Sequence, residues 1–174
     1  MGEPAAGEDE AAFQARHAAY PDELIRDLLR RVKVIAMVGA SANWNRPSYF
    51  AMKYLQEKGY RVIPVNPREA GKTVLGEVVQ ASLKDIPVAI DMVDCFRASA
   101  AIEPIAQEAI AIGAKVLWMQ LGVRNDAAAR HAEAAGLTTI MNRCPKIEYG
   151  RLSGEISWLG VTSKVISSRR QKKV

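Results

Sequence analysis

The feature of this sequence that most limits which folds the chain can adopt is an uninterrupted apolar stretch that ends at a glycine. Residues 34–38 read Val-Ile-Ala-Met-Val, a continuous apolar run typical of a short strand buried on both faces of a parallel sheet. Gly39 ends the run, and a glycine lets the backbone turn sharply or approach a ligand closely. Pro47 then favours the first turn of a helix, since its missing N–H would have no partner there. The segment therefore predicts a strand, a short loop and a helix.

A loop between a buried strand and a helix start is a common binding place for phosphate groups. The free N–H groups of the first turn and the positive end of the helix dipole both point at an anion held there. Arg46 adds a full positive charge, and Ser41, Asn43 and Ser48 are further donors. The alternative is a plain tight turn, because the loop has one glycine, Gly39, where the dinucleotide fingerprint G-x-G-x-x-G has three. The motif alone thus predicts an anion-binding loop and not a full dinucleotide site.

Strands and helices alternate along the chain. We expect strands at residues 34–38, 61–65, 88–93, 115–121 and 138–141, and helices at 47–58, 99–112 and 126–135. A weaker helical pattern from Phe13 to Arg31, divided by Pro21, predicts a leading helix on the flank of the domain. Such alternation is typical of an α/β, Rossmann-like parallel sheet of about five strands with helices on both faces. Right-handed crossovers favour the order 3-2-1-4-5, with ligand over the carboxyl ends of strands one and four.

Length and composition indicate one globular domain with short extensions. The chain has 174 residues, of which 49% are hydrophobic and 25% charged. We expect a leader over residues 1–31, disordered for about its first twelve residues, then a domain over 32–160 and a basic tail over 161–174. From Pro145 onward the sequence shows little periodicity. No apolar run approaches the roughly 20 residues of a membrane span, and the acidic N-terminus lacks the order of a signal peptide, so we expect a cytoplasmic protein.

The net charge of +5 and the cysteine count limit the classes of partner. Part of the charge lies in residues 169–173, a tail that is either a contact for nucleic acid or, more commonly, a solvated terminus. No basic surface interleaved with aromatic residues is evident, so we expect neither nucleic acid nor a membrane as partner. Cys95 and Cys144 are too few for a disulfide framework and lack metal-ligand spacing, so we expect both to be reduced and no metal to be bound.

The end of the second expected strand distinguishes between classes of nucleotide. Proteins that bind NAD commonly have Asp or Glu there, to hold the ribose 2′-hydroxyl. Here the residues are Asn66, Pro67 and Arg68, so a guanidinium stands near the place of the carboxylate. This favours a nucleotide with an extra phosphate on its ribose, either NADP or coenzyme A. An exposed loop arginine without a ligand is the alternative.

No group of residues makes a convincing catalytic site. Tyr49 and Lys53 have the Y-x-x-x-K spacing of short-chain dehydrogenases, but they lie in the first helix rather than a much later one. Asp91 and Asp94 are three residues apart, but the first belongs to an expected strand and the second to its end, so their spacing does not indicate a paired acid–base role. Cys144, in a basic sequence context, is either a reactive or ligand-adjacent thiol or an inert half-buried cysteine. We therefore predict no catalytic residue.

A series of short motifs occurs in a characteristic order. They are Val-Gly-Ala-Ser at 38–41, Arg-Pro-Ser-Tyr at 46–49, Tyr-Leu-Gln at 54–56, residues 59–67, Asp-Met-Val-Asp at 91–94 with Phe-Arg at 96–97, residues 112–123, Ala-Ala-Gly-Leu at 134–137, and residues 143–148. In this order the motifs resemble the stand-alone bacterial CoA-binding proteins, small Rossmann-like domains similar to the N-terminal domain of the succinyl-CoA synthetase alpha subunit. The resemblance covers roughly residues 34–152.

The resemblance implies where coenzyme A would bind. The ligand would lie along Gly39, Ala40, Ser41, Ala42 and Asn43. Its adenosine end would be bordered by Val65, Asn66, Pro67 and Arg68. The turn after strand three, with Val93, Phe96 and Arg97, would flank the adenine or ribose, and Gln120 would approach the pantetheine. Arg46 and Arg68 are the candidate phosphate partners.

The same resemblance gives no support for ligase activity. The phosphohistidine of the synthetase belongs to a second domain that this chain lacks, and no P-loop is present. We therefore expect a protein that binds coenzyme A or an acyl-CoA without catalysis of its own. An NADP-linked oxidoreductase and a metabolite-sensing partner domain are the alternatives.

Overall fold

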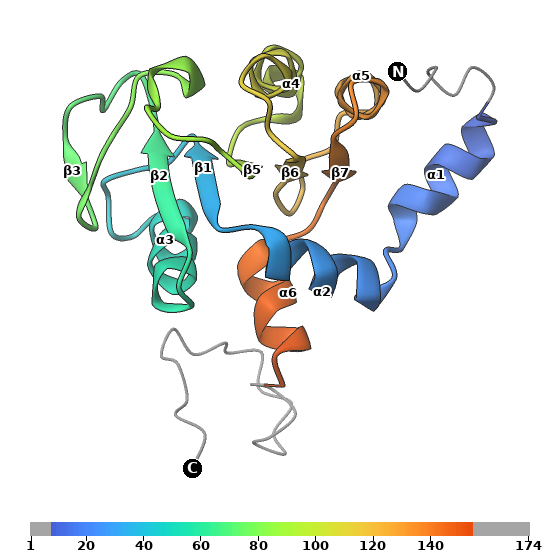
Figure 1. The fold of residues 1–174 in the computed structure, drawn as a ribbon, viewed down its shortest axis with the longest axis horizontal. Coiled ribbons are helices and arrows are strands. Elements are labelled where there is room, and N and C mark those ends of the chain that lie inside the picture. Colours follow the sequence, from blue (N-terminus) through green and yellow to red (C-terminus); the bar gives the residue numbers. More distant parts are fainter. Residues whose placement is uncertain (1–7, 155–174) are drawn as a thin grey trace.

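The structure, a computed structural model, describes residues 8–154 as a five-stranded parallel sheet flanked by helices (Figure 1). The strands of the sheet are β1 (Val34–Val38), β2 (Arg61–Val65), β5 (Met92–Cys95), β6 (Val116–Met119) and β7 (Thr138–Ile140). The helices are α1 (Glu10–Ala18), α2 (Asp22–Arg31), α3 (Pro47–Glu57), α4 (Ile102–Ala111), α5 (Asp126–Ala134) and α6 (Pro145–Leu152). The predicted α/β, Rossmann-like class is confirmed.

The order of the strands determines where a ligand can lie. The sheet runs β2-β1-β5-β6-β7, so Ile35 of β1 pairs with Val62 of β2 on one side and with Met92 of β5 on the other. Counted along these five strands the order is 2-1-3-4-5, which differs from the expected 3-2-1-4-5 in the side on which strand three joins. Both orders satisfy the right-handed crossover rule. The order reverses between β1 and β5, and ligands of open α/β sheets lie at such a point.

Two separate cores cover the two faces of the sheet. Because successive side chains of a strand point to opposite faces, Ala36 packs in the core under α4 and α5, whereas Ile35 and Met37 pack in the core under α2, α3 and α6. Figure 1 shows these two groups of helices on opposite sides of the sheet. The carboxyl ends of the strands lie between the two layers and open to the loops that follow β1, β5 and β6.

The leader forms two helices rather than one continuous element. Pro21 separates α1 from α2, as its position predicts. Residues 10–12 belong to α1, so the expectation of disorder was wrong there, while residues 1–7 lie outside the described residues. Phe13 is fully buried in the core that also contains Ala128 and Ala132 of α5. The leader is therefore packed against the flank of the domain, as expected.

Three elements differ from the prediction. Strand β5 begins at Met92 and ends at Cys95, four and two residues later than the expected 88–93. Residues 68–87, for which no strand was predicted, contain the short hairpin of β3 (Thr73–Val74) and β4 (Glu77–Val78), followed by a 3-10 turn at Leu83–Asp85. Helix α6 was missed, because its buried positions include Glu148 and Gly150 rather than an apolar stripe. The predicted basic tail lies outside the described residues, and no helix within residues 8–154 is long and apolar enough to cross a membrane.

Candidate functional site

Three loops meet at the carboxyl ends of β1, β2 and β5. The Gly39 N–H donates to the carbonyl of Val65 at 2.9 Å, and the Asn66 side-chain amide donates to the carbonyl of Ala40 at 2.8 Å. On the other side, the Phe96 N–H donates to the last carbonyl of β1 at 2.8 Å. The loop after β1 is therefore held between the loops after β2 and β5, at the point where the strand order reverses.

At Gly39 the first of these loops lies close to the third. The glycine's φ of +84° lies in the left-handed region, and a Cβ added there would stand 2.3 Å from the carbonyl oxygen of Phe96 and 2.9 Å from Cδ of Arg97. The predicted sharp turn at Gly39 is confirmed, and the short distance to Phe96 leaves no room for a Cβ, so only glycine fits both requirements.

Three backbone N–H groups in the loop after β1, those of Ser41, Ala42 and Asn43, have partners within the protein. The Ser41 N–H donates to Oγ of the buried Ser48 at 3.1 Å, and the Asn43 N–H donates to Oγ of Ser41 at 3.1 Å. The Ala42 N–H donates to a carboxylate oxygen of Glu69 at 2.7 Å. These three N–H groups thus donate to acceptors of the protein itself.

Glu69 contacts the loop after β1, and its sequence position did not point to this contact. The Asn66 side chain accepts the N–H of Arg68 at 3.0 Å, and the Asn66 carbonyl accepts the N–H of Glu69 at 3.1 Å. This turn folds the chain back and brings the Glu69 carboxylate to Ala42, 27 positions earlier in the sequence. The asparagine before the proline is the available signal, since asparagine favours such turns.

Three arginines surround the same edge. Arg46 precedes α3, Arg68 follows β2 and Arg97 follows β5, and all three are exposed. Within residues 8–154 none of the three makes a salt bridge. Asn43 and Pro67 are exposed in the same loops. The structure thus brings together the residues that the sequence predicted after strands one, two and three.

Two further predicted site residues, Val93 and Gln120, are buried, and the first of them lies outside the turn in which it was expected. Val93 is inside β5 and fully buried in the core under α4, so it is not part of the turn, which begins at Phe96. Gln120 follows β6 and is buried, with its amide nitrogen donating to both carboxylate oxygens of Asp94 at 2.9 and 3.1 Å. Burial raises the pKa of Asp94 to about 7, and the Gln120 hydrogen bond only partly opposes this. The Gln120 amide nitrogen therefore has a buried acceptor within the protein, and its approach to the pantetheine stays a prediction.

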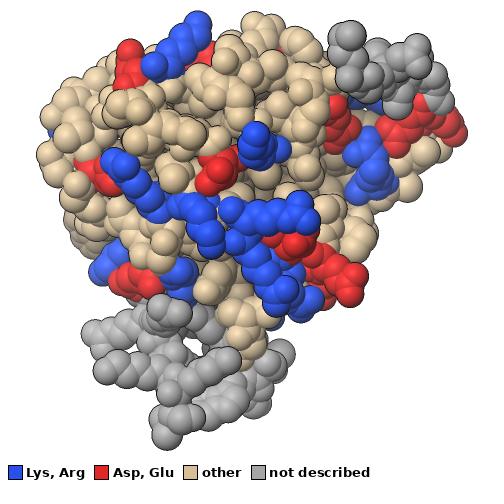
Figure 2. All heavy atoms as spheres, viewed as in Figure 1, with Lys and Arg blue, Asp and Glu red and all other residues tan. Residues whose placement is uncertain are grey.

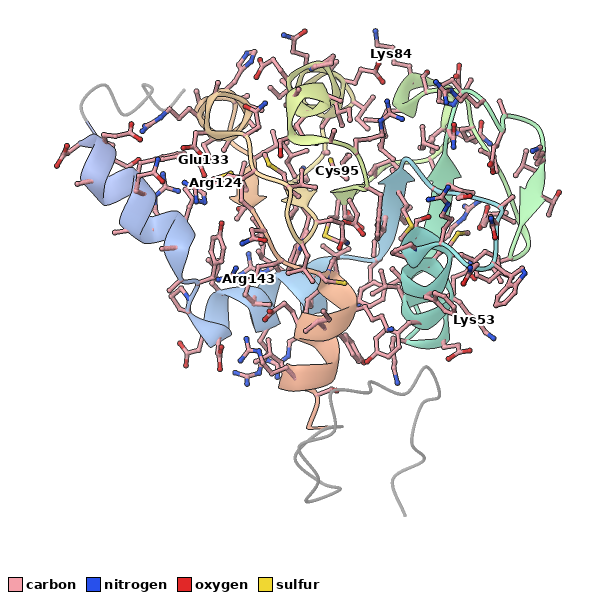
Figure 3. The ribbon with its side chains drawn as sticks, turned by 180° about the vertical axis from the view of Figure 1, so that it is seen from behind. Lys53, Lys84, Cys95, Arg124, Glu133 and Arg143 are labelled. Carbon is pink, nitrogen blue, oxygen red and sulfur yellow. The ribbon has the colours of Figure 1, made fainter. Side chains whose placement is uncertain are left out.

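The candidate catalytic residues do not assemble. Asp91 accepts the N–H groups of Lys33 and Val34 at 2.9 Å each, at the start of β1, so it does not pair with Asp94 near the strand ends. Cys144 caps α6 and is buried, and this burial raises the pKa of its thiol. Cys95 is fully buried on the central strand seen in Figure 3, and burial raises its pKa well above the usual value. Both thiols are free, and their environments favour the inert alternative.

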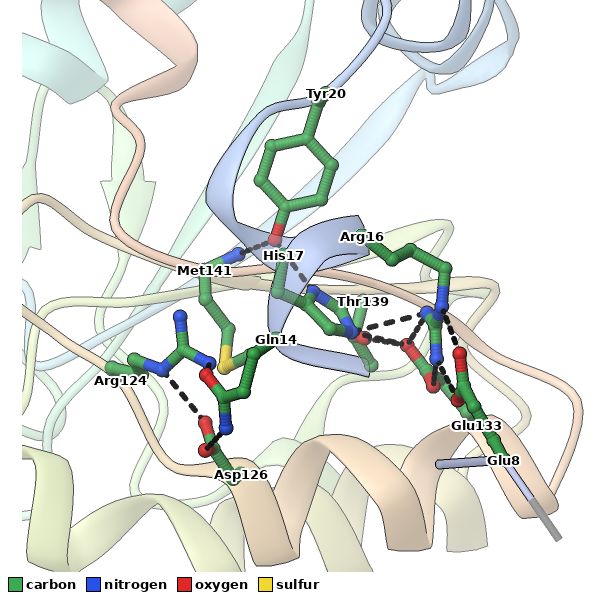
Figure 4. Close-up of polar contacts among 10 residues, drawn as sticks. All are labelled: Glu8, Gln14, Arg16, His17, Tyr20, Arg124, Asp126, Glu133, Thr139 and Met141. Carbon is green, nitrogen blue, oxygen red and sulfur yellow. Dashed lines mark hydrogen bonds and ion pairs between the residues drawn. The ribbon is translucent and has the colours of Figure 1, made fainter. Parts of the chain in front are cut away.

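A polar cluster that the sequence did not single out joins α1 to α5 and β7 (Figure 4). The Glu133 carboxylate accepts from Arg16 at 2.9 Å, lies 3.1 Å from the buried His17 ring and also accepts from Thr139. Burial opposes ionisation of Glu133, but these hydrogen bonds outweigh it and lower its pKa to about 2. The Tyr20 hydroxyl accepts the N–H of Met141 at 2.8 Å. Because every group contacts another part of the protein, the cluster anchors the leader.

Lysine and arginine side chains gather on one face over α2, and acidic side chains lie among them (Figure 2). Arg31 pairs with Asp27 at 2.5 Å, and Arg151 of α6 pairs with Asp22 at 2.8 Å. The positive charge of this face is therefore partly neutralised by its own neighbours.

Comparisons with known proteins are consistent with this geometry. A family model described as a CoA binding domain matches residues 33–150. The uncharacterized protein YneT of Bacillus subtilis (strain 168) is 38% identical over 125 residues, which are 72% of this chain and 91% of that protein. A solved structure, that of a hypothetical protein from Pyrococcus horikoshii OT3, is 43% identical to this chain with a TM-score of 0.74. The match covers 78% of this chain and 94% of that protein's chain. The structure of cell-free ID.343 from Thermus thermophilus is 36% identical with a TM-score of 0.73. This match covers 76% of this chain and 98% of the Thermus chain. The chain therefore belongs to the CoA-binding domain family.

Proposed function

We propose that this protein binds coenzyme A, free or acylated, in the crevice formed by the loops after β1, β2 and β5, without catalysis of its own. The observation that carries the proposal is the meeting of these loops around Gly39, between β1 and β5, in a chain of the CoA-binding domain family. Ligands of open α/β sheets lie at this point of the fold.

The charges of the site support a ligand with several phosphates. Arg46 lies at the start of α3, where the helix dipole also favours an anion. Arg68 stands after β2, and Arg97 follows β5 beside Gly39. Coenzyme A has a pyrophosphate and a ribose phosphate, and guanidinium groups bind phosphate with paired hydrogen bonds. In this proposal the three arginines hold the nucleotide half of the ligand.

The burial of two candidate reactive groups supports binding rather than catalysis. Asp94 is fully buried and accepts from Gln120, and burial raises the pKa of the Cys144 thiol, which favours its protonated form. General acid–base catalysis needs a group that reaches the reacting atoms. The same reasoning counts against an NADP-linked oxidoreductase.

Arg46→Ala and Arg68→Glu are expected to weaken the binding of coenzyme A, each by about 1.5–3 kcal/mol, because each variant removes a charge-assisted hydrogen bond. Isothermal titration calorimetry with the full chain measures the dissociation constants. Arg30→Ala is the matched control, because Arg30 is exposed on α2, away from the crevice. Wild-type affinity in both site variants would refute these roles.

A further inference from the structure

A carboxylate of the protein occupies the loop in which the ligand's phosphates would lie. The Ala42 N–H donates to Oε2 of Glu69 at 2.7 Å. This length is that of a charge-assisted hydrogen bond. The Glu69 side chain is half-buried and reaches the loop from the turn that follows β2.

Glu69 is the charged one among the groups named here that accept hydrogen bonds from the backbone of this loop. Ser41 and Asn43 donate their N–H groups to serine hydroxyls, and Arg46 donates its N–H to the carbonyl of Asn43 at 3.0 Å. A neutral hydroxyl can rotate and donate to an incoming phosphate. A carboxylate cannot do so, because it only accepts hydrogen bonds and repels a second anion. In the described part of the loop, Glu69 is therefore the acceptor that an anionic ligand must replace.

The contact is not needed to hold the two loops together. The Asn66 side chain bonds to the carbonyl of Ala40 at 2.8 Å, and the Gly39 N–H bonds to the carbonyl of Val65 at 2.9 Å. These two hydrogen bonds join the loops after β1 and β2 whether or not Glu69 reaches Ala42. The two loops therefore stay joined by these hydrogen bonds when the carboxylate leaves Ala42.

We infer that Glu69 is an internal competitor for the anion-binding loop. It takes the Ala42 N–H in the free protein, and an anionic group of the ligand displaces it, so Glu69 lowers the affinity for coenzyme A. This inference rests on the proposed function. It predicts that the affinity reflects an exchange of one anion for another and not the filling of a vacant site.

Glu69→Gln tests the inference, because the amide keeps the size of the side chain and an oxygen acceptor for Ala42 but loses the charge. The dissociation constant for coenzyme A, measured by calorimetry, should fall about tenfold, since a neutral hydrogen bond is about half as strong as a charged one. Glu77→Gln is the control: it makes the same change of net charge on β4, where Glu77 pairs with Arg61 at 3.0 Å, and should leave the affinity within twofold. Glu69→Asp keeps the charge but shortens the side chain, and should give a smaller gain than Glu69→Gln.

The amide resonance of Ala42 provides a second measurement. In ¹H–¹⁵N spectra it should shift in free Glu69→Gln, and it should also shift when the wild-type protein is saturated with coenzyme A. Unchanged or weaker binding of coenzyme A by Glu69→Gln would overturn the inference while leaving the proposed function intact, and weaker binding would make Glu69 a ligand contact. If the wild-type protein does not bind coenzyme A at all, both the function and the inference fail.

Discussion

Gly39→Ala is expected to destabilise the protein by about 2–5 kcal/mol and to weaken the binding of coenzyme A severely. The left-handed backbone of Gly39 costs a residue with a Cβ about 1–2 kcal/mol, and overpacking adds about 1–3 kcal/mol. The overpacking contribution arises because the Cβ of the alanine would lie 2.3 Å from the backbone oxygen of Phe96. To relieve this clash the loops after β1 and β5 must separate, and the crevice between them changes shape. Urea unfolding measures the stability, and calorimetry measures the binding.

Gly76→Ala is the matched control for this effect. Gly76 has the same φ of +84°, but a Cβ added there would have no atom within 4 Å. Gly76→Ala should therefore lower the free energy of unfolding only through the left-handed backbone conformation, by about 1–2 kcal/mol. Equal losses of stability in the two variants would contradict the close contact between the loops.

Asp94→Asn is expected to change how stability depends on pH. Burial raises the pKa of Asp94 from 3.8 to about 7. The folded state therefore binds more protons than the unfolded state between these values, so the stabilisation is complete below about pH 4 and is lost as the pH rises through about 7. The shift corresponds to about 4 kcal/mol at most. Asparagine stays neutral and keeps an oxygen for Gln120, so the variant should be more stable than the wild-type protein at pH 8. Its free energy of unfolding should also change less with pH.

Unfolding by urea at pH 5 and pH 8 measures this difference. The lowered pKa of Glu133 has the opposite effect, since its contribution to stability is lost as the pH falls. This loss occurs only below about pH 4.5 and so does not affect the comparison. Asp27→Asn is the control, since the Asp27 side chain is 51% exposed on α2. Parallel pH profiles for the wild-type protein and Asp94→Asn would show that Asp94 is ionised at low cost in the folded state.

The parts of the fold that depend on local sequence could be predicted. The apolar run, Gly39 and Pro47 specify β1, the turn and the start of α3 through backbone preferences of the residues themselves. The side of β1 on which β5 joins could not be predicted, because the two orders differ in packing between segments far apart in sequence. Helix α6 lacks an apolar stripe and so gave no periodic signal.

The same distinction holds for the site. Gly39, Asn66 and Arg68 mark the ends of strands, where ligands of α/β proteins bind, so their position could be predicted. The contact of Ala42 with Glu69 joins residues 27 positions apart, and that of Gln120 with Asp94 joins residues 26 apart. Neither has a local sequence signature, because the first depends on how two loops fold against each other and the second on the pairing of β5 with β6.

The most direct test of the account is calorimetric and thermal-shift titration of the wild-type protein with coenzyme A, acetyl-CoA, NADPH and NADH in parallel. We predict that coenzyme A or acetyl-CoA binds and that the two nicotinamide nucleotides do not. A ligand at 100 times its dissociation constant should add about 2.7 kcal/mol to the free energy of unfolding. Stabilisation by NADPH with no response to either CoA compound would contradict the proposed function.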